Sequence, residues 1–222
     1  MKLTAERIID AGMEIFAEGG YHALSMRQVA ERLDAQAGSL YYHVKNKNAL
    51  LQLMADRVAR QAYDAGTAAL AALPDPRDWR ARLEAQASSL RRSIQPHPGA
   101  ALLLAHSPTV LSVGALSLME RLLLTLSDAG VPDEDRGIAA DTILSHVTGF
   151  VLQEQSESVT PTVSAKEAAE LYRRFPRTIA AGLAFDADEK FARSVRLLCA
   201  AVATLIAPED RTPAESGAVP TK

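Results

Sequence analysis

Hydroxyl, imidazole and ammonium groups are concentrated in one short segment near the N-terminus, residues 39–47, which reads SLYYHVKNK. Leu40 and Val44 stand four positions apart, a spacing that places two apolar side chains on one helix face. The side chains left to face outward are Ser39, Tyr42 and His43, with Tyr41 at the margin and Lys45 and Lys47 just beyond. Such groups can bond phosphates and base edges when a helix lies in the major groove of DNA. The segment therefore predicts a DNA-reading helix.

Two helices and a turn are expected to hold this reading segment. The first helix begins at Ser25, which can accept the amide of Gln28 while the Gln28 side chain reaches back, the pattern of a capping box. The apolar positions that follow keep helical spacing: Val29, Ala30 and Leu33. Residues 34–36 are too polar to extend that stripe, so the chain is expected to turn and to open the reading helix at residues 37–39.

Helical spacing continues along the chain, and an apolar content of 48% with few aromatic residues favours helices over a sheet. Thr4 is expected to cap a first helix that the glycines at 19–20 end. Asn46 or Asn48 is expected to start a long helix that runs through about Tyr63 and connects the reading unit to a larger body. Further helices are expected at residues 79–94, 100–106, 109–129, 133–154, 166–171, 175–182 and 187–206, with a mobile loop at 155–165.

The N-terminal features in this order resemble the DNA-binding domain of TetR-family repressors. The resemblance rests on the first helix, Gly19-Gly20-Tyr21, and the segments LSMRQVAERL and SLYYHVKNKNALL, of which LYYHVKNK is close to the tetracycline repressor branch. It implies DNA contacts by Arg27, Gln36, Ala37, Ser39, Tyr41, Tyr42, His43 and Lys47. That branch has proline where this chain has Gly38 and tryptophan where it has Tyr42, so the operator is expected to differ.

The rest of the chain resembles the C-terminal domain of the same branch more loosely, through HPGAALLLAHSPT, HVTGFVLQEQ and FDADEKFARSVRLL. Aligned on these cues, the histidine that binds the metal falls on Leu103, its threonine and arginine neighbours fall on His106 and Ser107, and the histidine that grips the drug falls on Tyr63. The resemblance therefore implies an effector other than a magnesium–tetracycline complex.

The resemblance also implies an effector pocket lined by eight residues: Tyr63, Trp79, Leu83, Leu103, His106, Met119, His146 and Phe150. The alternative is that these aromatic and histidine side chains fill the core, and His106 and His146 fit either interpretation. The sequence has no HExxH pattern and no paired Cys/His spacing, so we expect no metal and no cofactor. It also lacks a GxSxG elbow and a Gly-rich phosphate loop, so we expect no enzyme.

Charge is divided along the chain in a way that suits contact with DNA at one end. The net charge is -3, but residues 1–60 carry eight Lys and Arg against seven Asp and Glu, whereas the remainder carries sixteen against twenty. A small end near DNA and an acidic body facing away would give this distribution. The single cysteine, Cys199, lies in an apolar run and reads as a small buried hydrophobe.

We therefore expect an all-α protein with a three-helix helix-turn-helix DNA-binding domain in residues 1–47, a helical ligand-binding and dimerisation domain in residues 48–207, and a disordered tail in residues 208–222. Its expected partners are a double-stranded operator, a small-molecule effector and a second copy of the chain, without a membrane, and the expected location is the cytoplasm. The alternative function is a DNA-binding helical protein whose body binds a protein partner and answers to no small molecule.

Overall fold

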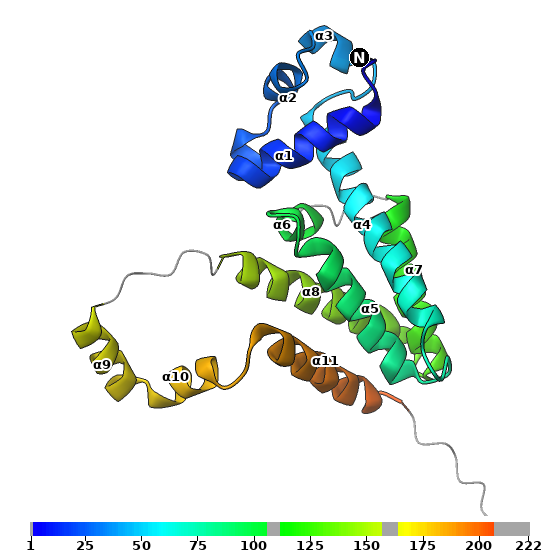
Figure 1. The fold of residues 1–222 in the computed structure, drawn as a ribbon. Helices are drawn as coiled ribbons and strands as arrows, with labels where there is room; N and C mark the ends of the chain where they lie inside the picture. The colour runs from blue at the N-terminus through cyan, green and yellow to red at the C-terminus, as the bar shows by residue number, and fades with distance from the viewer. Residues whose placement is uncertain (1, 106–111, 157–163, 207–222) are drawn as a thin grey trace, which may run out of the picture.

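The computed structural model describes residues 2–105, 112–156 and 164–206, and within them the chain forms eleven helices and no strand (Figure 1). This confirms the predicted all-α architecture, with an N-terminal helix-turn-helix unit and a C-terminal helical body. The helices are α1 (Ala5–Ala23), α2 (Met26–Arg32), α3 (Ala37–Leu40), α4 (Lys47–Ala71), α5 (Trp79–Ile94), α6 (Ala100–Ala105), α7 (Val113–Asp128), α8 (Asp133–Ser156), α9 (Ala165–Arg174), α10 (Pro176–Leu183) and α11 (Ala187–Ala203). No helix in these ranges has the length and apolar character needed to span a bilayer.

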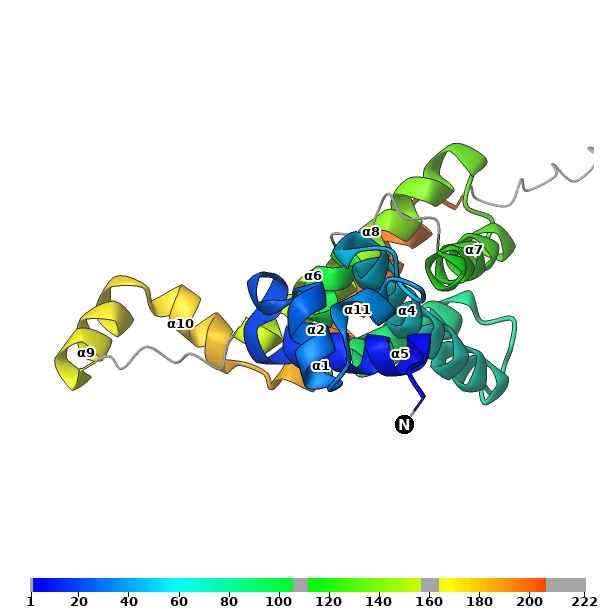
Figure 2. The same cartoon turned by 90° about the horizontal axis from the view of Figure 1, so that it is seen from above.

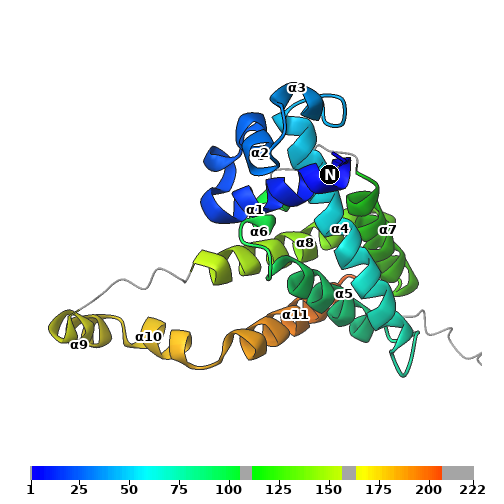
Figure 3. The same ribbon diagram turned by 45° about the horizontal axis from the view of Figure 1, so that its top comes forward.

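The N-terminal unit consists of α1, α2 and α3 packed on the first half of α4, at one end of the molecule (Figures 1 and 3). One side chain from each of these helices is fully buried in its centre: Ile8, Val29, Leu40 and Leu50. Arg32 ties α2 to α1 by donating hydrogen bonds to Glu14 (3.1 Å) and Glu18 (2.6 Å). The bond from Arg32 lowers the pKa of Glu18, so the carboxylate form is favoured in the folded unit.

The body is built on α5, which packs against α4, α7, α8 and α11. Its core contains apolar residues at helical spacing on each of these helices, including Leu83, Leu122, Val147 and Val195. Helices α9 and α10 behave differently, because none of their residues is buried. Figures 1 and 2 both show these two helices projecting from the body as an arm.

Helix α4 belongs to both parts. Leu50 and Met54 lie in the N-terminal cluster, whereas Val58 and Ala62 lie in the core of the body. One continuous helix therefore contributes to both cores and joins the reading unit to the body. The division of the chain at residue 47 stays a prediction.

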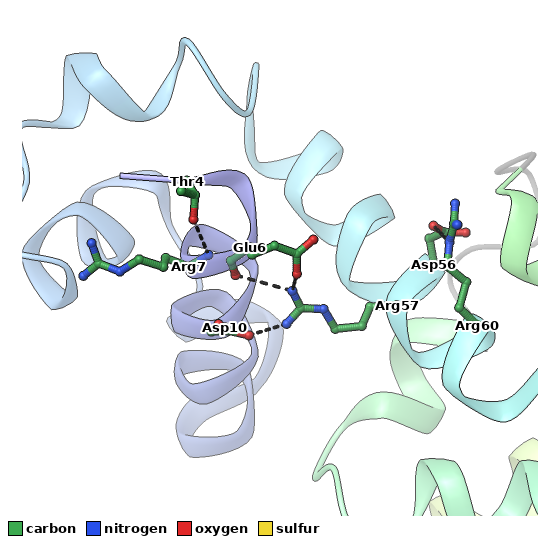
Figure 4. Close-up of polar contacts among 7 residues, drawn as sticks. All are labelled: Thr4, Glu6, Arg7, Asp10, Asp56, Arg57 and Arg60. Atoms are coloured by element: carbon green, nitrogen blue, oxygen red, sulfur yellow. Dashed lines mark hydrogen bonds and ion pairs between the residues drawn. The ribbon is translucent and has the colours of Figure 1, made fainter. Parts of the chain in front are cut away.

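Side chains on opposite faces of α4 join the two parts (Figure 4). Arg57 forms ion pairs with Glu6 and Asp10 of α1. The neighbouring Asp56 points to the other side, where it accepts the amide N–H of Gly114 at the start of α7 (2.8 Å). Two adjacent residues of one helix therefore connect it to the reading unit and to the body.

The ends of the first and fourth helices were predicted with different success. The regular helix of α1 is interrupted at the predicted glycine pair, because Gly20 takes the non-helical values φ 66° and ψ −158°, and a further helical segment after this kink runs through Ala23. Helix α4 begins at the cap Asn46, whose side chain accepts the amide of Ala49 (2.8 Å), and it runs to Ala71 rather than ending near Tyr63. The alanine-rich segment after Tyr63 favours a helix, and the first proline comes at position 74.

Helices flanking the predicted loop at 155–165 also extend further than expected. Helix α8 includes Gln155, because its side-chain amide donates to the carbonyls of Ile94 and His97 and so holds the helix end in place. Helix α9 starts at Ala165 and reaches Arg174, since a complete capping box between Ser164 and Glu167 fixes its start. The core of that loop, residue 106 and the predicted tail at 208–222 lie outside the described residues.

Candidate nucleic-acid interface and effector site

The reading segment presents its polar side chains as predicted, although its helix is short. Helix α3 spans only Ala37–Leu40, and a turn continues it through residue 43. Leu40 and Val44 are buried against the N-terminal core. Tyr42 between them is 92% exposed, so the whole phenol ring faces away from the protein.

The exposed groups of this segment are available to a ligand. Within the described ranges, no protein hydrogen bond engages the hydroxyl of Tyr42, the imidazole of His43 or the ammonium of Lys45. Tyr41 is 51% exposed, and Gln36 and Ala37 are exposed beside it. Ser39 is half-buried, and its hydroxyl donates to the carbonyl of Gln36 (2.6 Å). Within the described residues, the surface thus combines two aromatic hydroxyls, of Tyr41 and Tyr42, with one imidazole and one ammonium, all without internal hydrogen-bond partners.

The two predicted phosphate contacts with longer side chains are already engaged. Lys47 donates to the carbonyl of Tyr21 (2.7 Å) and lies 3.7 Å from the centre of the Tyr21 ring. Arg27 is exposed and paired with Glu31, with 2.8 Å between Nε and the carboxylate. Lys47 therefore joins the start of α4 to the end of α1. The unengaged ammonium of the segment belongs to Lys45, which the family pattern did not select.

The start of α2 positions this surface. Ser25 accepts the amide of Gln28 (3.2 Å), as predicted for a cap. The return contact differs from a capping box, because the side-chain oxygen of Gln28 accepts the Ser25 hydroxyl (2.8 Å) rather than the backbone amide. One orphan amide of α2 is satisfied by this cap, and the cap fixes the direction from which the chain enters the motif.

The described residues predicted to line a pocket are spread over several sites, not all of them in the body core. Leu83 is buried in the core of the body, whereas Leu103 is buried in the N-terminal cluster. Trp79, at the start of α5, lies under the guanidinium of Arg80, 4.3 Å from ring centre to Cζ. Met119 packs on the body core from α7. His106 lies outside the described residues.

His146 and Phe150 are brought together, with their ring centres 5.9 Å apart. Phe191 of α11 completes this cluster and stacks on His146 at 6.1 Å. His146 also shares a hydrogen bond with the hydroxyl of Ser194 (2.7 Å), and burial lowers its pKa. A neutral, hydrogen-bonded imidazole among aromatic rings supports the core interpretation of His146.

A small cavity lies elsewhere in the body, among α5, α7 and α8, with a volume of about 10 Å³. Gln86 and Arg121 supply its polar wall, and the other walls are apolar. Sequence reasoning missed both residues. The available signal was Gln86, a polar side chain on the helix face that Leu83 and Leu90 bury. Among the described residues, no three His, Cys, Asp or Glu side chains gather as a metal site.

A helix-turn-helix unit with an exposed aromatic and basic surface, joined by one long helix to a helical body, defines a DNA-binding transcriptional regulator. The comparisons agree with this class. Residues 8–54 match the model for bacterial regulatory proteins of the tetR family, and residues 73–206 match the tetracyclin repressor-like C-terminal domain. The chain belongs to the TetR family of transcriptional regulators, and it is not an enzyme.

Relatives and solved structures cover most of the chain. The class C tetracycline repressor of Escherichia coli is 31% identical over 155 residues, which are 70% of this chain and 68% of that protein. The TetR-family protein ActR of Streptomyces coelicolor, solved with actinorhodin, is 26% identical with a TM-score of 0.71 over 92% of this chain and 98% of ActR. BioQ, solved with its double-stranded DNA operator, is 27% identical with a TM-score of 0.64 over 91% of this chain and 99% of BioQ.

Proposed function

We propose that this protein is a homodimeric repressor that binds a palindromic operator and is released by a small-molecule effector other than magnesium–tetracycline. The observation that carries the proposal is the exposed surface of Tyr42 and His43, held between the buried anchors Leu40 and Val44, with the exposed Lys45 directly after Val44. Similar chains have been solved with an operator and with a small molecule, which supports both halves of the proposal.

The DNA half can be tested without a known operator. Binding sites are selected from a random duplex library, and affinity is then measured by fluorescence anisotropy for wild type and for the double variant Tyr42→Ala/His43→Ala. We expect specific binding to be lost, because each good base contact contributes about 1–3 kcal/mol of discrimination. Tyr172→Ala, which removes a 51% exposed tyrosine from α9, is the matched control. Unchanged operator affinity in the double variant would refute the assignment.

Two lysines separate phosphate contact from structural support. Lys45→Ala should weaken binding to all sequences and reduce the salt slope by about one, since a phosphate contact carries no base information. Lys47 was predicted to make that contact, but in the free protein it is bonded to Tyr21. If Lys47 contacts DNA, its ammonium must leave the Tyr21 carbonyl first. Measuring the salt slope for both variants identifies which ammonium meets a phosphate.

The dimer is proposed to form through α8 and α11. One reading helix covers a half-site, and two must lie about 34–36 Å apart to enter successive major grooves. Ile138 on α8 and Leu197 on α11 are 68% and 72% exposed, which is unusual for large apolar side chains unless a partner covers them. Leu197→Glu should give a folded monomer in light scattering at micromolar concentration. Leu198 packs on the body core, so Leu198→Glu should unfold the chain instead. A wild-type monomer would rule out this architecture.

The exclusion of magnesium–tetracycline rests on two positions. Leu103 is 3% exposed and packs on the N-terminal cluster, so it offers no ligand to a metal. The second position is Tyr63, on which the resemblance places the histidine that grips the drug. Here the backbone carbonyl of Tyr63 accepts a hydrogen bond from Arg121, and the Arg121 guanidinium lies 4.4 Å from the centre of the Tyr63 ring. Titration with tetracycline and Mg²⁺ should leave operator binding unchanged. Release of the operator by this pair would overturn the exclusion.

A second function, in which the body binds a protein partner, is favoured by the arm of α9 and α10. The arm and the turn after it expose five large apolar side chains: Leu171, Tyr172, Phe175, Leu183 and Phe185. An exposed apolar surface of this kind typically marks a protein interface. Deuterium exchange of the arm in the purified protein tests the choice, since protection there by the second copy of the chain would leave no surface for another partner.

A further inference from the structure

Arg121 of α7 is a half-buried charge without a countercharge. Its Nη1 donates to the carbonyl of Tyr63 (2.6 Å) and to the hydroxyl of Thr67 (3.0 Å), and its Nε donates to the side-chain oxygen of Gln86 (3.3 Å). All three acceptors are neutral. Burial lowers the pKa of Arg121, against weaker opposite effects of Tyr63 and Asp64. In the described part of the chain, no carboxylate lies within ion-pair distance of this guanidinium.

Other buried arginines of the body are paired with acids. Arg91 binds Glu154 and Asp188, at 2.5 and 2.7 Å. Arg82, one helix turn before Gln86, binds Asp128 at 2.7 Å. A buried cation without an anion is costly, because neutral acceptors replace only part of the lost hydration. Because Arg82 and Arg91 both have carboxylate partners, the lack of an ion-pair partner is specific to Arg121 among these three arginines.

Arg121 lines the small cavity among α5, α7 and α8, while its guanidinium rests on α4 beside Tyr63 and Thr67. Gln86 forms the rest of the polar wall, and its amide nitrogen donates to Thr125, which is fully buried (2.9 Å). The opposite walls are apolar: Leu90, Leu118, Leu122, Ile143 and Leu144. A cavity of about 10 Å³ holds roughly one water, so a larger ligand has to part α7 from α5 and α8.

We propose that this site takes an organic acid, with its carboxylate on Arg121 and the amide of Gln86 and its apolar body between α7 and α8. The proposal deepens the proposed function and rests on it for the regulatory role of the site. A carboxylate supplies the charge that Arg121 lacks, and arginine binds it with two parallel hydrogen bonds. The apolar walls favour a single carboxylate on an apolar body over a phosphate, since burying a second negative charge here has no further cation to offset it.

Binding of an acid would also loosen α4. Arg121 now bridges α7 to α4 through the carbonyl of Tyr63 and the hydroxyl of Thr67. Gly66 between them has no side chain, and a Cβ there would overlap the guanidinium, so this glycine leaves room for Arg121 to lie against α4. A carboxylate that draws the guanidinium into the cavity removes both bonds to α4. The acid therefore binds more tightly when α4 is free to tilt, which is the differential affinity that release of DNA requires.

The test uses matched acids and amides on the full-length chain. Benzoate, 2-naphthoate and octanoate are each compared with benzamide, 2-naphthamide and octanamide by thermal shift and calorimetry at neutral pH. We expect at least one acid to raise the melting temperature while its amide does not. Arg121→Met should weaken the affinity for that acid by roughly tenfold to a hundredfold, which is the free energy of a hydrogen bond to a charged group expressed as a ratio of dissociation constants. Arg82→Met is the matched control and should retain acid binding.

The outcomes separate this proposal from the proposed function. If no acid binds more tightly than its amide, or if Arg121→Met keeps the preference for acids, the assignment of the site is overturned. If an acid binds through Arg121 but leaves affinity for the selected operator unchanged, the acid site is supported and effector control of DNA binding is refuted. Selection of an operator in the absence of acid tests DNA binding independently.

Discussion

Gly99 offers a sharp test of how the body contacts the reading unit. It lies between α5 and α6 with φ +81°, and a Cβ added there would come within 2.5 Å of Cε1 and 2.8 Å of Cδ1 of Phe16 in α1. Gly99→Ala therefore has two costs. A left-handed conformation costs an L-residue roughly 1–2 kcal/mol, and overpacking typically costs about 1–3 kcal/mol. We expect Gly99→Ala to destabilise the chain by about 2–5 kcal/mol.

Gly130 provides a matched control for the first cost. It has φ +86° after α7, but a Cβ there would meet its nearest neighbour, Ile206, at an ordinary 3.6 Å. Gly130→Ala should therefore cost only about 1–2 kcal/mol. Urea unfolding measures both variants, and the difference between them is the energy of the contact with Phe16.

Phe16→Leu then tests the origin of that difference. The smaller leucine side chain should relieve the steric overlap that Gly99→Ala creates, so that the double variant is more stable than the sum of the two single changes predicts. Gly130→Ala should remain additive with Phe16→Leu, because no contact joins the two positions. Equal destabilisation by Gly99→Ala and Gly130→Ala, or additivity at Gly99, would show that α1 does not rest on this loop as described.

Three further predictions concern single side chains. Burial alone would raise the pKa of Asp56, but hydrogen bonds, including the one from the amide of Gly114, hold this pKa below its ordinary value of 3.8. The stability that the Asp56 carboxylate contributes is therefore fully present above pH 3.8 and is lost as the pH falls through the lower pKa of the folded state. Asp56→Asn should therefore destabilise the chain at pH 7 and flatten its acid denaturation curve below about pH 4. Burial raises the pKa of Cys199 to about 11, so its thiol should react with a disulfide reagent at pH 7 only after unfolding. Lys47→Ala should lower stability in urea by about 1 kcal/mol through loss of its bond and ring contact with Tyr21, whereas Lys45→Ala should leave stability unchanged.

Local patterns predicted the helices and the orientation of the reading segment. Leu40 and Val44 are buried and Tyr42 is exposed because spacing on one helix determines a common face. Helix ends were harder to predict where a distant residue decides them. Gln155 extends α8 by binding carbonyls near the end of α5, more than fifty residues away in the sequence. No local pattern contains that information.

The polar wall of the body cavity could be predicted only in part. Gln86 was missed, although it interrupts an apolar helix face and its sequence position was a signal of a buried polar side chain. Arg121 gave no such signal, because its lack of an ion-pair partner depends on where the acidic side chains lie in the folded protein. Arg91 has the same residue type on a neighbouring helix, yet it is paired with Glu154 from α8. Residue type alone therefore could not distinguish a structural ion pair from an open anion site.

In the proposed mechanism an effector and DNA are coupled through α4, so the contacts that hold this helix set the energy required. Asp56 connects α4 to α7 and Arg57 connects it to α1, from opposite faces of the helix (Figure 4). A hundredfold change in DNA affinity requires coupling of about 3 kcal/mol. The hydrogen bonds of Arg121 to Tyr63 and Thr67 are charge-assisted, and each such bond contributes about 1.5–3 kcal/mol. Under the proposal, loss of these two bonds supplies an energy of the required size, whereas the ion pairs of Arg57 keep the reading unit attached to α4.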